Sequence, residues 1–143
     1  MAKTDTLLYL AARNEHVKNK IEPALSKGKV VICDRFIDST LAYQVYGKKV
    51  SLGLINSIHK HILKKNKPDL TFVLKVNVSK ALKRLNKRKN KNRYDKFNYA
   101  FYNKVQNGFL KISKNKNKYM LIDSNASIHS NKQKIFDKIN SIT

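Results

Sequence analysis

The chain has 143 residues, a formal net charge of +22 and 41% hydrophobic residues. This length suffices for one domain with a buried core but not for two, and the hydrophobic fraction excludes an intrinsically disordered chain. The single cysteine excludes an intrachain disulfide, and no Cys/His spacing typical of a metal site occurs. No apolar stretch approaches the roughly 20 residues of a transmembrane helix, so we expect a cytoplasmic protein that does not enter a membrane.

The excess of basic residues admits two interpretations. One is a polyanionic partner such as RNA, DNA or an anionic membrane surface. The other is a Lys- and Asn-rich composition spread over solvated faces, which we favour because the lysines are dispersed and do not keep to one face. The most basic run is NKRKNKNRYD at residues 86–95. It matches no RRM, KH, zinc or helix-turn-helix pattern, so we do not expect a nucleic-acid partner.

The hydrophobic pattern predicts helices that alternate with short apolar strands. Three apolar runs, each bounded by turn-forming or charged residues, predict buried strands near residues 30–34, 70–76 and 119–123. Parallel strands joined through helices make an α/β fold with right-handed crossovers. Helices are expected over residues 1–26, 36–46, 51–65, 79–85 and 97–114, with a last helix after residue 131. His59 and His61 are expected at the surface or edge of their helix rather than as metal ligands.

Charged and polar side chains follow the first predicted strand, at residues 34–44. Asp34 and Arg35 stand where the strand ends, and ligands bind beyond the carboxyl ends of the strands in open α/β sheets. Hydroxyl, amide and aromatic side chains come next: Asp38, Ser39, Thr40, Tyr43 and Gln44. A guanidinium followed by these hydrogen-bonding groups predicts an anion-binding site at the mouth of the sheet.

Residues 29–44 resemble the thymidylate kinase family. That family has a strand followed by Asp-Arg-Tyr or a variant, then a Ser/Thr/Asn pair and Ala-Tyr-Gln; the chain has Asp34-Arg35-Phe36, Ser39-Thr40 and Ala42-Tyr43-Gln44. The similarity continues upstream through LLYLAAR and IEPAL and covers residues 1–143 almost without gaps. It implies one thymidylate kinase-like domain with the three-layer fold of P-loop NTPases, a parallel sheet flanked by helices.

The resemblance also implies a reaction, the transfer of the ATP γ-phosphoryl group to dTMP with Mg²⁺, giving dTDP. Arg35 is then expected to clamp the acceptor phosphate, with Asp34 near the Mg²⁺ and the phosphates. Arg84 is expected to pack on the adenine of ATP, and a lid at residues 86–96 brings Arg88 and Arg93 to the transferred phosphoryl group. The side chains expected to contact thymidine are Tyr9, which stacks on the base, and Arg13, Ser39, Thr40, Tyr43 and Gln44. The resemblance further implies a homodimer.

The phosphate-binding motif GxxxxGK[ST] does not occur in the chain, and none of its four glycines is spaced for a phosphate cradle. In the family, Met1 would align after the P-loop strand, which lies between the strands predicted near 30–34 and 70–76. We therefore expect an N-terminally truncated domain whose central P-loop strand is missing. Such a chain is expected to be poorly stable alone and unable to bind ATP productively.

Two other hypotheses remain open. A basic nucleic-acid-binding module would bind with an affinity that falls steeply with salt and scarcely depends on mononucleotides. An inactive remnant of a kinase gene would have no activity. The reading frame upstream of the Met1 codon distinguishes a remnant from a kinase whose remaining part is encoded there.

Overall fold

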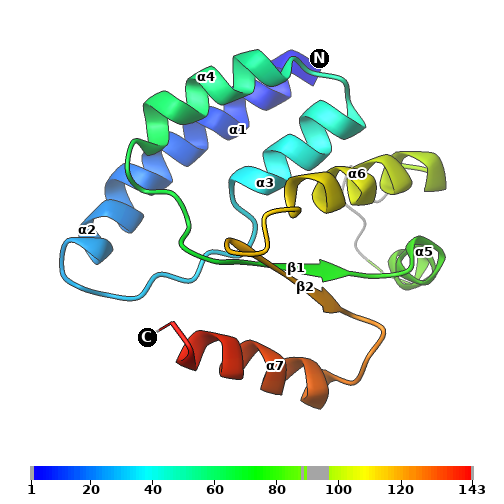
Figure 1. Ribbon diagram of the computed structural model, residues 1–143. Helices are drawn as coiled ribbons and strands as arrows, with labels where there is room; N and C mark the ends of the chain where they lie inside the picture. Colours follow the sequence, from blue (N-terminus) through cyan, green and yellow to red (C-terminus); the bar gives the residue numbers. More distant parts are fainter. Residues whose placement is uncertain (1, 88, 90–96, 143) are drawn as a thin grey trace.

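The computed structural model describes residues 2–87, 89 and 97–142 (Figure 1). Within them, strands β1 (Thr71–Lys75) and β2 (Tyr119–Asp123) pair in parallel, with Thr71 opposite Tyr119 and Lys75 opposite Asp123. The helical elements are α1 (Ala2–His16), the π-helical turn η1 (Val17–Ile21), α2 (Glu22–Leu25), α3 (Ile37–Thr40), the π-helix η2 (Leu41–Gly47), α4 (Leu52–Leu63), α5 (Val78–Asn86), α6 (Tyr99–Ile112) and α7 (Ile128–Asn140).

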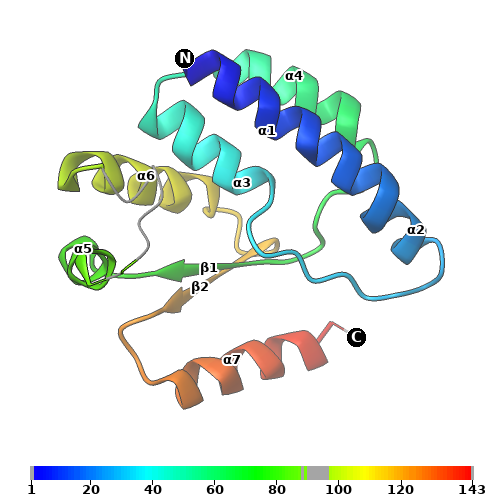
Figure 2. The same cartoon turned by 180° about the vertical axis from the view of Figure 1, so that it is seen from behind.

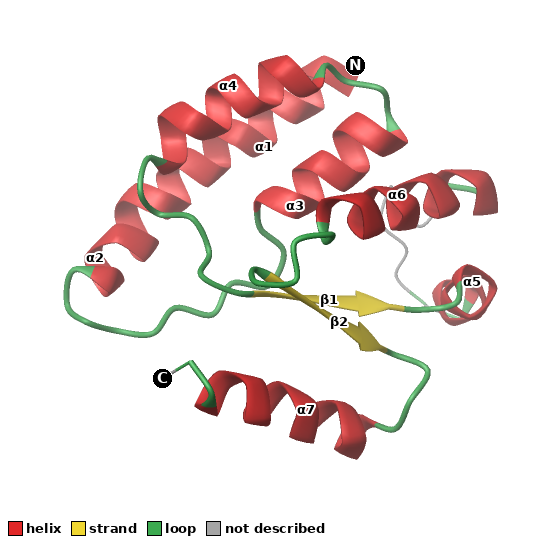
Figure 3. Cartoon of the chain, in the orientation of Figure 1, coloured by secondary structure: helices red, strands yellow, loops and turns green. Residues whose placement is uncertain are grey.

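Helices lie on both sides of the sheet. Figure 1 and the reverse view in Figure 2 show α6 and α3 on one side of the strands and α7 on the other. Helices α1 and α4 run side by side beyond α3 and lie farthest from α7. Figure 3 shows that only a small part of the chain is strand. The predicted α/β architecture, with parallel strands near 70–76 and 119–123, is confirmed. Among the described residues, no helix is long and apolar enough to cross a membrane.

Two apolar clusters hold the helices together. The first joins α1, η1 and α4 through Leu10, Val17, Ile21, Ile62 and Leu63. The second joins η2 to α6 through Ala42, Phe101 and Val105. Both follow from apolar residues repeated at helical spacing, which place one stripe of each helix against its neighbour.

Two glycines allow η2 and α6 to approach closely. A Cβ on Gly108 of α6 would lie 2.7 Å from a ring carbon of Tyr46, and a Cβ on Gly47 would lie 2.8 Å from the Phe101 ring. Each glycine therefore accommodates an aromatic side chain of the opposite helix. This contact fixes η2, which carries Tyr43 and Gln44, against α6.

The strand predicted at 30–34 is wrong. Residues 29–33 form no ladder, and in the described part of the chain only β1 and β2 pair with each other. Val30 and Ile32 are 82% and 89% exposed, whereas Val31 packs against the first apolar cluster. The segment thus keeps the alternation of a strand but is covered on one face only. An apolar run favours a strand, but a strand also needs a hydrogen-bonding neighbour, which the described residues do not provide.

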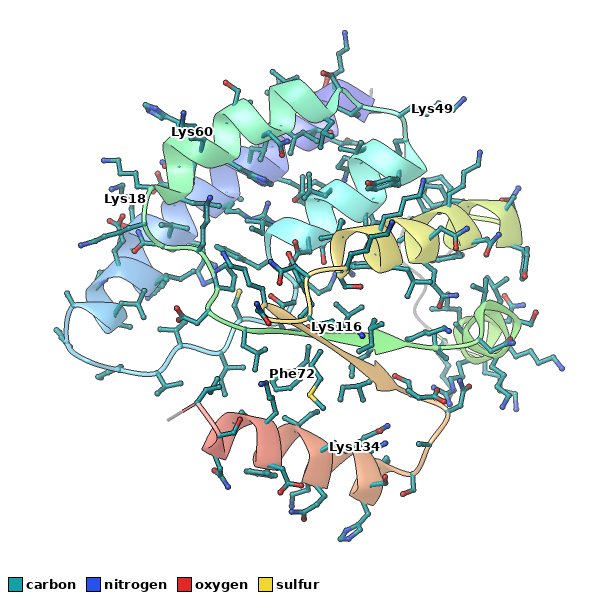
Figure 4. The ribbon with its side chains drawn as sticks, in the orientation of Figure 1. Lys18, Lys49, Lys60, Phe72, Lys116 and Lys134 are labelled. Carbon is teal, nitrogen blue, oxygen red and sulfur yellow. The ribbon has the colours of Figure 1, made fainter. Side chains whose placement is uncertain are left out.

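Lysines extend from several separate parts of the described chain. In Figure 4, Lys18 of η1, Lys49 of the loop after η2 and Lys60 of α4 extend outward from separate parts of the molecule. In the same view Phe72 lies between β1 and α7. The dispersal agrees with a composition bias rather than a basic surface restricted to one face.

Candidate functional site

One face of α1 is turned toward α3 and η2. Asp5 and Arg13 both reach across: Lys48 Nζ lies 3.3 Å from Asp5 Oδ2, and an Arg13 Nη donates to Thr40 Oγ1 at 2.6 Å. Tyr9 lies midway between Asp5 and Arg13 at the helical spacing of four residues, so it shares their face. Its side chain remains 39% exposed. Arg13 of α1 thus contacts Thr40 of α3, and Tyr9 lies on the same face of α1 as Arg13.

The Arg13 guanidinium is held by three acceptors. The nitrogen that donates to Thr40 also lies 3.2 Å from His59 Nε2, and the other Nη donates to the Phe36 carbonyl oxygen at 3.1 Å. The guanidinium carbon stands 5.3 Å from the centroid of the Phe36 ring. Burial lowers the pKa of Arg13, and the neighbouring acceptors replace the water that the charged group gives up.

His59 is buried, contrary to the surface or edge position expected for it. Its side chain is 6% exposed, on the face of α4 that packs against α1. Burial and the adjacent Arg13 charge lower its pKa to about 4, so the imidazole is neutral at pH 7. Because a guanidinium only donates, Nε2 must accept and the ring proton resides on Nδ1.

A second buried hydrogen bond ties the same stretch to the sheet. The Tyr119 hydroxyl, at the start of β2, donates to Asp38 Oδ1 at 3.0 Å. Burial raises the pKa of Asp38, although this hydrogen bond and Arg13 act in the opposite direction. Burial, with the Asp38 charge, raises the pKa of Tyr119 to about 12. The segment 36–40 is thus fixed from α1 and α4 on one side and from β2 on the other.

Arg35 has a strained backbone and an exposed side chain. Its φ is +64°, in the left-handed region that residues other than glycine rarely occupy. The guanidinium carbon lies 4.7 Å from the centroid of the Tyr43 ring, within the range of a cation–π contact. Tyr43 is itself fixed by edge-on contacts with Phe101 and Phe109, whose ring centroids are 6.2 and 6.3 Å away. The predicted proximity of Arg35 and Tyr43 is present.

A cavity of about 430 Å³ opens beside this pair. Three cationic side chains line it, Arg35, Lys75 and Arg84, together with the aromatic rings of Tyr43, Tyr102 and Phe109. The remainder of its wall is mostly apolar side chains of β1, α5 and α6, together with Val76 and the polar Gln106. The two arginines predicted for opposite substrates, Arg35 for the acceptor and Arg84 for the donor, therefore face one cavity. Its mixture of positive charge and flat apolar surface suits an anion with an aromatic ring.

The remaining predicted site residues differ in their exposure. Asp34 is exposed, Ser39 is half-buried and Gln44 is buried on η2. Arg88 and Arg93, with most of the predicted lid, lie outside the described residues. No group of three or more His, Cys, Asp or Glu side chains that could hold a metal occurs in the described ranges. A single exposed carboxylate such as Asp34 is compatible with Mg²⁺, because Mg²⁺ is commonly held by one or two carboxylates together with substrate phosphates.

Sequence reasoning missed His59 and Tyr119. The position of His59 could have been found, because Ile55, His59 and Ile62 follow one another at the spacing of a single helix face and both isoleucines are buried. Nothing in the sequence around Tyr119 distinguishes its hydroxyl from that of any other tyrosine at the start of a strand. Its pairing with Asp38 depends on the three-dimensional arrangement alone.

The fold and this site define an α/β protein with a cationic, aromatic cavity suited to a nucleotide. The family model described as thymidylate kinase matches residues 2–135, and the chain belongs to the thymidylate kinase family. The thymidylate kinase of the Wolbachia endosymbiont of Brugia malayi is 44% identical over 140 residues, covering 98% of this chain and 66% of that protein. The thymidylate kinase of Wolbachia pipientis wMel is 48% identical over 110 residues, covering 77% and 54%.

A solved structure gives the same result. The crystal structure of thymidylate kinase from Ehrlichia chaffeensis superposes with a TM-score of 0.76 at 27% identity, over 97% of this chain and 67% of that one. The chain thus spans two thirds or less of the length of these curated relatives. The chain therefore belongs to this family and shares its fold.

Proposed function

We propose that this chain takes part in dTMP phosphorylation, the transfer of the ATP γ-phosphoryl group to dTMP that gives dTDP, and carries the monophosphate-binding part of that enzyme. The observation that supports this most directly is the arrangement at Arg35, whose exposed guanidinium lies over Tyr43 at the edge of a cavity large enough for a nucleotide. Membership of the thymidylate kinase family supports the identity of the substrates.

In this proposal dTMP, the phosphoryl acceptor, is held at its 5′-phosphate and at its nucleoside. The planar fork of Arg35 binds the 5′-phosphate of dTMP with two parallel hydrogen bonds, and its strained backbone keeps the side chain directed at the site. Tyr9 stacks on the thymine, while Arg13 and Thr40 face the base. Ser39, Tyr43 and Gln44 position the nucleoside. Because these residues position the substrate and neutralise charge, they need not transfer a proton.

Of the residues proposed to bind ATP, the phosphoryl donor, fewer lie in the described part of the chain. Arg84 shares the cavity with Arg35 and is proposed to pack on the adenine of ATP. Arg88 and Arg93, in the proposed lid at residues 86–96, neutralise the charge on the transferred phosphoryl group. Asp34 would contribute one carboxylate ligand to Mg²⁺, which supplies charge neutralisation at the phosphates. The chain contains no GxxxxGK[ST] segment, so we expect it to bind dTMP but not to cradle the triphosphate by itself.

The test is titration calorimetry with dTMP on the chain and on the variant Arg35→Gly. Glycine relieves the positive φ, so the variant should be more stable by about 1 kcal/mol while binding dTMP at least tenfold more weakly. Lys49→Gly is the matched control, because Lys49 also has a positive φ, 59°, and lies outside the proposed site. It should gain similar stability and bind dTMP as the original chain does. Unchanged dTMP binding by Arg35→Gly would contradict the assignment.

Three broader features belong to the same proposal. The whole chain, residues 1–143, acts as one domain in the cytoplasm, a compartment compatible with the unpaired, half-buried Cys33. It forms a homodimer through helix packing, for which Leu7 and Leu8 of α1, 52% and 66% exposed, offer an apolar surface. Light scattering coupled to size exclusion should give twice the monomer mass, and Leu8→Lys should reduce it to that of the monomer.

A further inference from the structure

We propose that His59 is a positioning residue that acts through Arg13 to fix the nucleoside-binding segment at residues 36–40. The inference deepens the proposed function and rests on it for the identity of the nucleoside. It begins from the geometry of the Arg13 guanidinium, whose donors on both Nη atoms are directed to three separate acceptors.

The three acceptors come from different parts of the chain. Thr40 Oγ1 and the Phe36 carbonyl belong to the segment that the guanidinium positions, at 2.6 and 3.1 Å. His59 Nε2 belongs to α4, at 3.2 Å, and is the acceptor from outside that segment. One Nη carries two hydrogens, so it can serve Thr40 and His59 together. His59 therefore determines which hydrogen of Arg13 remains for Thr40, and so the direction of the Thr40 contact.

The surroundings of His59 allow no ready replacement for its lone pair. The side chain is 6% exposed, and Ile58 and Ile62, its neighbours on α4, pack in the first apolar cluster. The charged groups near it are Arg13 on α1 and, beyond Arg13, Asp38 on α3. Without an acceptor at this position, a guanidinium hydrogen would point into apolar surroundings. The guanidinium would then turn away, and Thr40 and the Phe36 carbonyl would lose their donor.

A pair of substitutions separates the acceptor from the volume of the ring. In His59→Gln the amide oxygen can occupy the place of Nε2, whereas His59→Met fills similar space without a comparable acceptor. His61→Met, on the exposed side of the same helix, is the matched control. The first measurement needs no ligand: NMR signals of the Arg13 guanidinium, which are resolved only when rotation of the group is restricted. They should persist in the original chain, His59→Gln and His61→Met, and broaden in His59→Met.

The second measurement is the affinity for dTMP and for dCMP by titration calorimetry. We expect His59→Met to bind dTMP at least tenfold more weakly and to discriminate less between the two nucleotides, with His59→Gln within about threefold of the original chain. A purely structural role would lower the melting temperature without this rescue by glutamine.

The outcomes separate the two proposals. An original chain that binds no dTMP overturns the proposed function, and the guanidinium signals alone then decide whether His59 orders Arg13. A chain that binds dTMP equally well with methionine at position 59 overturns the positioning role and leaves the proposed function intact. An ordered guanidinium in His59→Met overturns it as well.

Discussion

The helical half of the molecule and the half around the sheet differ in how their side chains are buried and paired. Around α1, α3 and α4, the buried polar groups Thr40 and His59 are paired with the half-buried Arg13. Around the sheet, Val30, Ile32 and Leu74 are 82%, 89% and 62% exposed, and no residue of α7 is buried. Residues 36–40, the segment proposed to bind the nucleoside, are therefore held mainly by the helices, and the sheet contributes the Tyr119 contact with Asp38.

Removing Arg13 should have the largest effect, because it leaves several buried acceptors without their donor. We expect Arg13→Met to lower the free energy of unfolding by about 3 to 4 kcal/mol, measured by urea denaturation. Arg84→Met is the matched control, since Arg84 is exposed, and should change it by less than about 0.5 kcal/mol. Equal stability of the two variants would show that the helical half does not depend on the hydrogen bonds of Arg13.

Acidification should weaken the same half of the molecule. The pKa of His59 is lowered from 6.5 to about 4 in the folded chain, so between these values the unfolded chain binds a proton that the folded chain does not. The titration of His59 should therefore leave the free energy of unfolding unchanged above pH 6.5 and lower it by about 3 kcal/mol as the pH drops to 4. His59→Gln cannot titrate. The free energy of unfolding is measured in urea against pH for the original chain and for His59→Gln. The predicted loss is the difference between these two profiles, and parallel profiles would contradict it.

The close approach of η2 and α6 can be tested with an added methyl group. In Gly108→Ala the new Cβ would lie 2.7 Å from the Tyr46 ring and 2.8 Å from the Tyr46 Cβ, which cannot move without the backbone of η2. We expect a loss of about 2 kcal/mol in thermal or urea unfolding. Gly53→Ala is the control, because its nearest neighbour outside the helix backbone is a Ser51 oxygen 3.8 Å away. That helical substitution should stabilise the chain by up to about 1 kcal/mol.

Changes in the exposed segment before the site should have the smallest effect on stability. Val30→Lys combined with Ile32→Lys places charges where the side chains already face water. We expect the free energy of unfolding to change by less than about 0.5 kcal/mol, with higher solubility on precipitation by ammonium sulfate. Val31→Lys provides the contrast, because Val31 packs against the first apolar cluster, and this substitution should lower the free energy of unfolding by about 1 to 2 kcal/mol.

Much of this arrangement could be predicted from local patterns. Strands at 71–75 and 119–123 followed from short apolar runs, and the proximity of Arg35 to Tyr43 followed from their place in a recognisable motif. The strand at 30–34 could not be judged in the same way, because pairing depends on a neighbour and not on the residues of the segment. The contact of His59 with Arg13 and the Tyr119–Asp38 hydrogen bond could not be predicted, because they depend on how distant helices and strands meet.

The parallel pairing of β1 with β2 has a consequence for the order of folding. The partners Thr71 and Tyr119 lie far apart in sequence, and α5 and α6 both intervene. Closing so long a loop costs chain entropy before any ladder hydrogen bond compensates it. The individual helices, whose hydrogen bonds are local, should therefore form early, and the strands should join late. In pulse-labelling exchange, the amides of β2 would then acquire protection after those of α6.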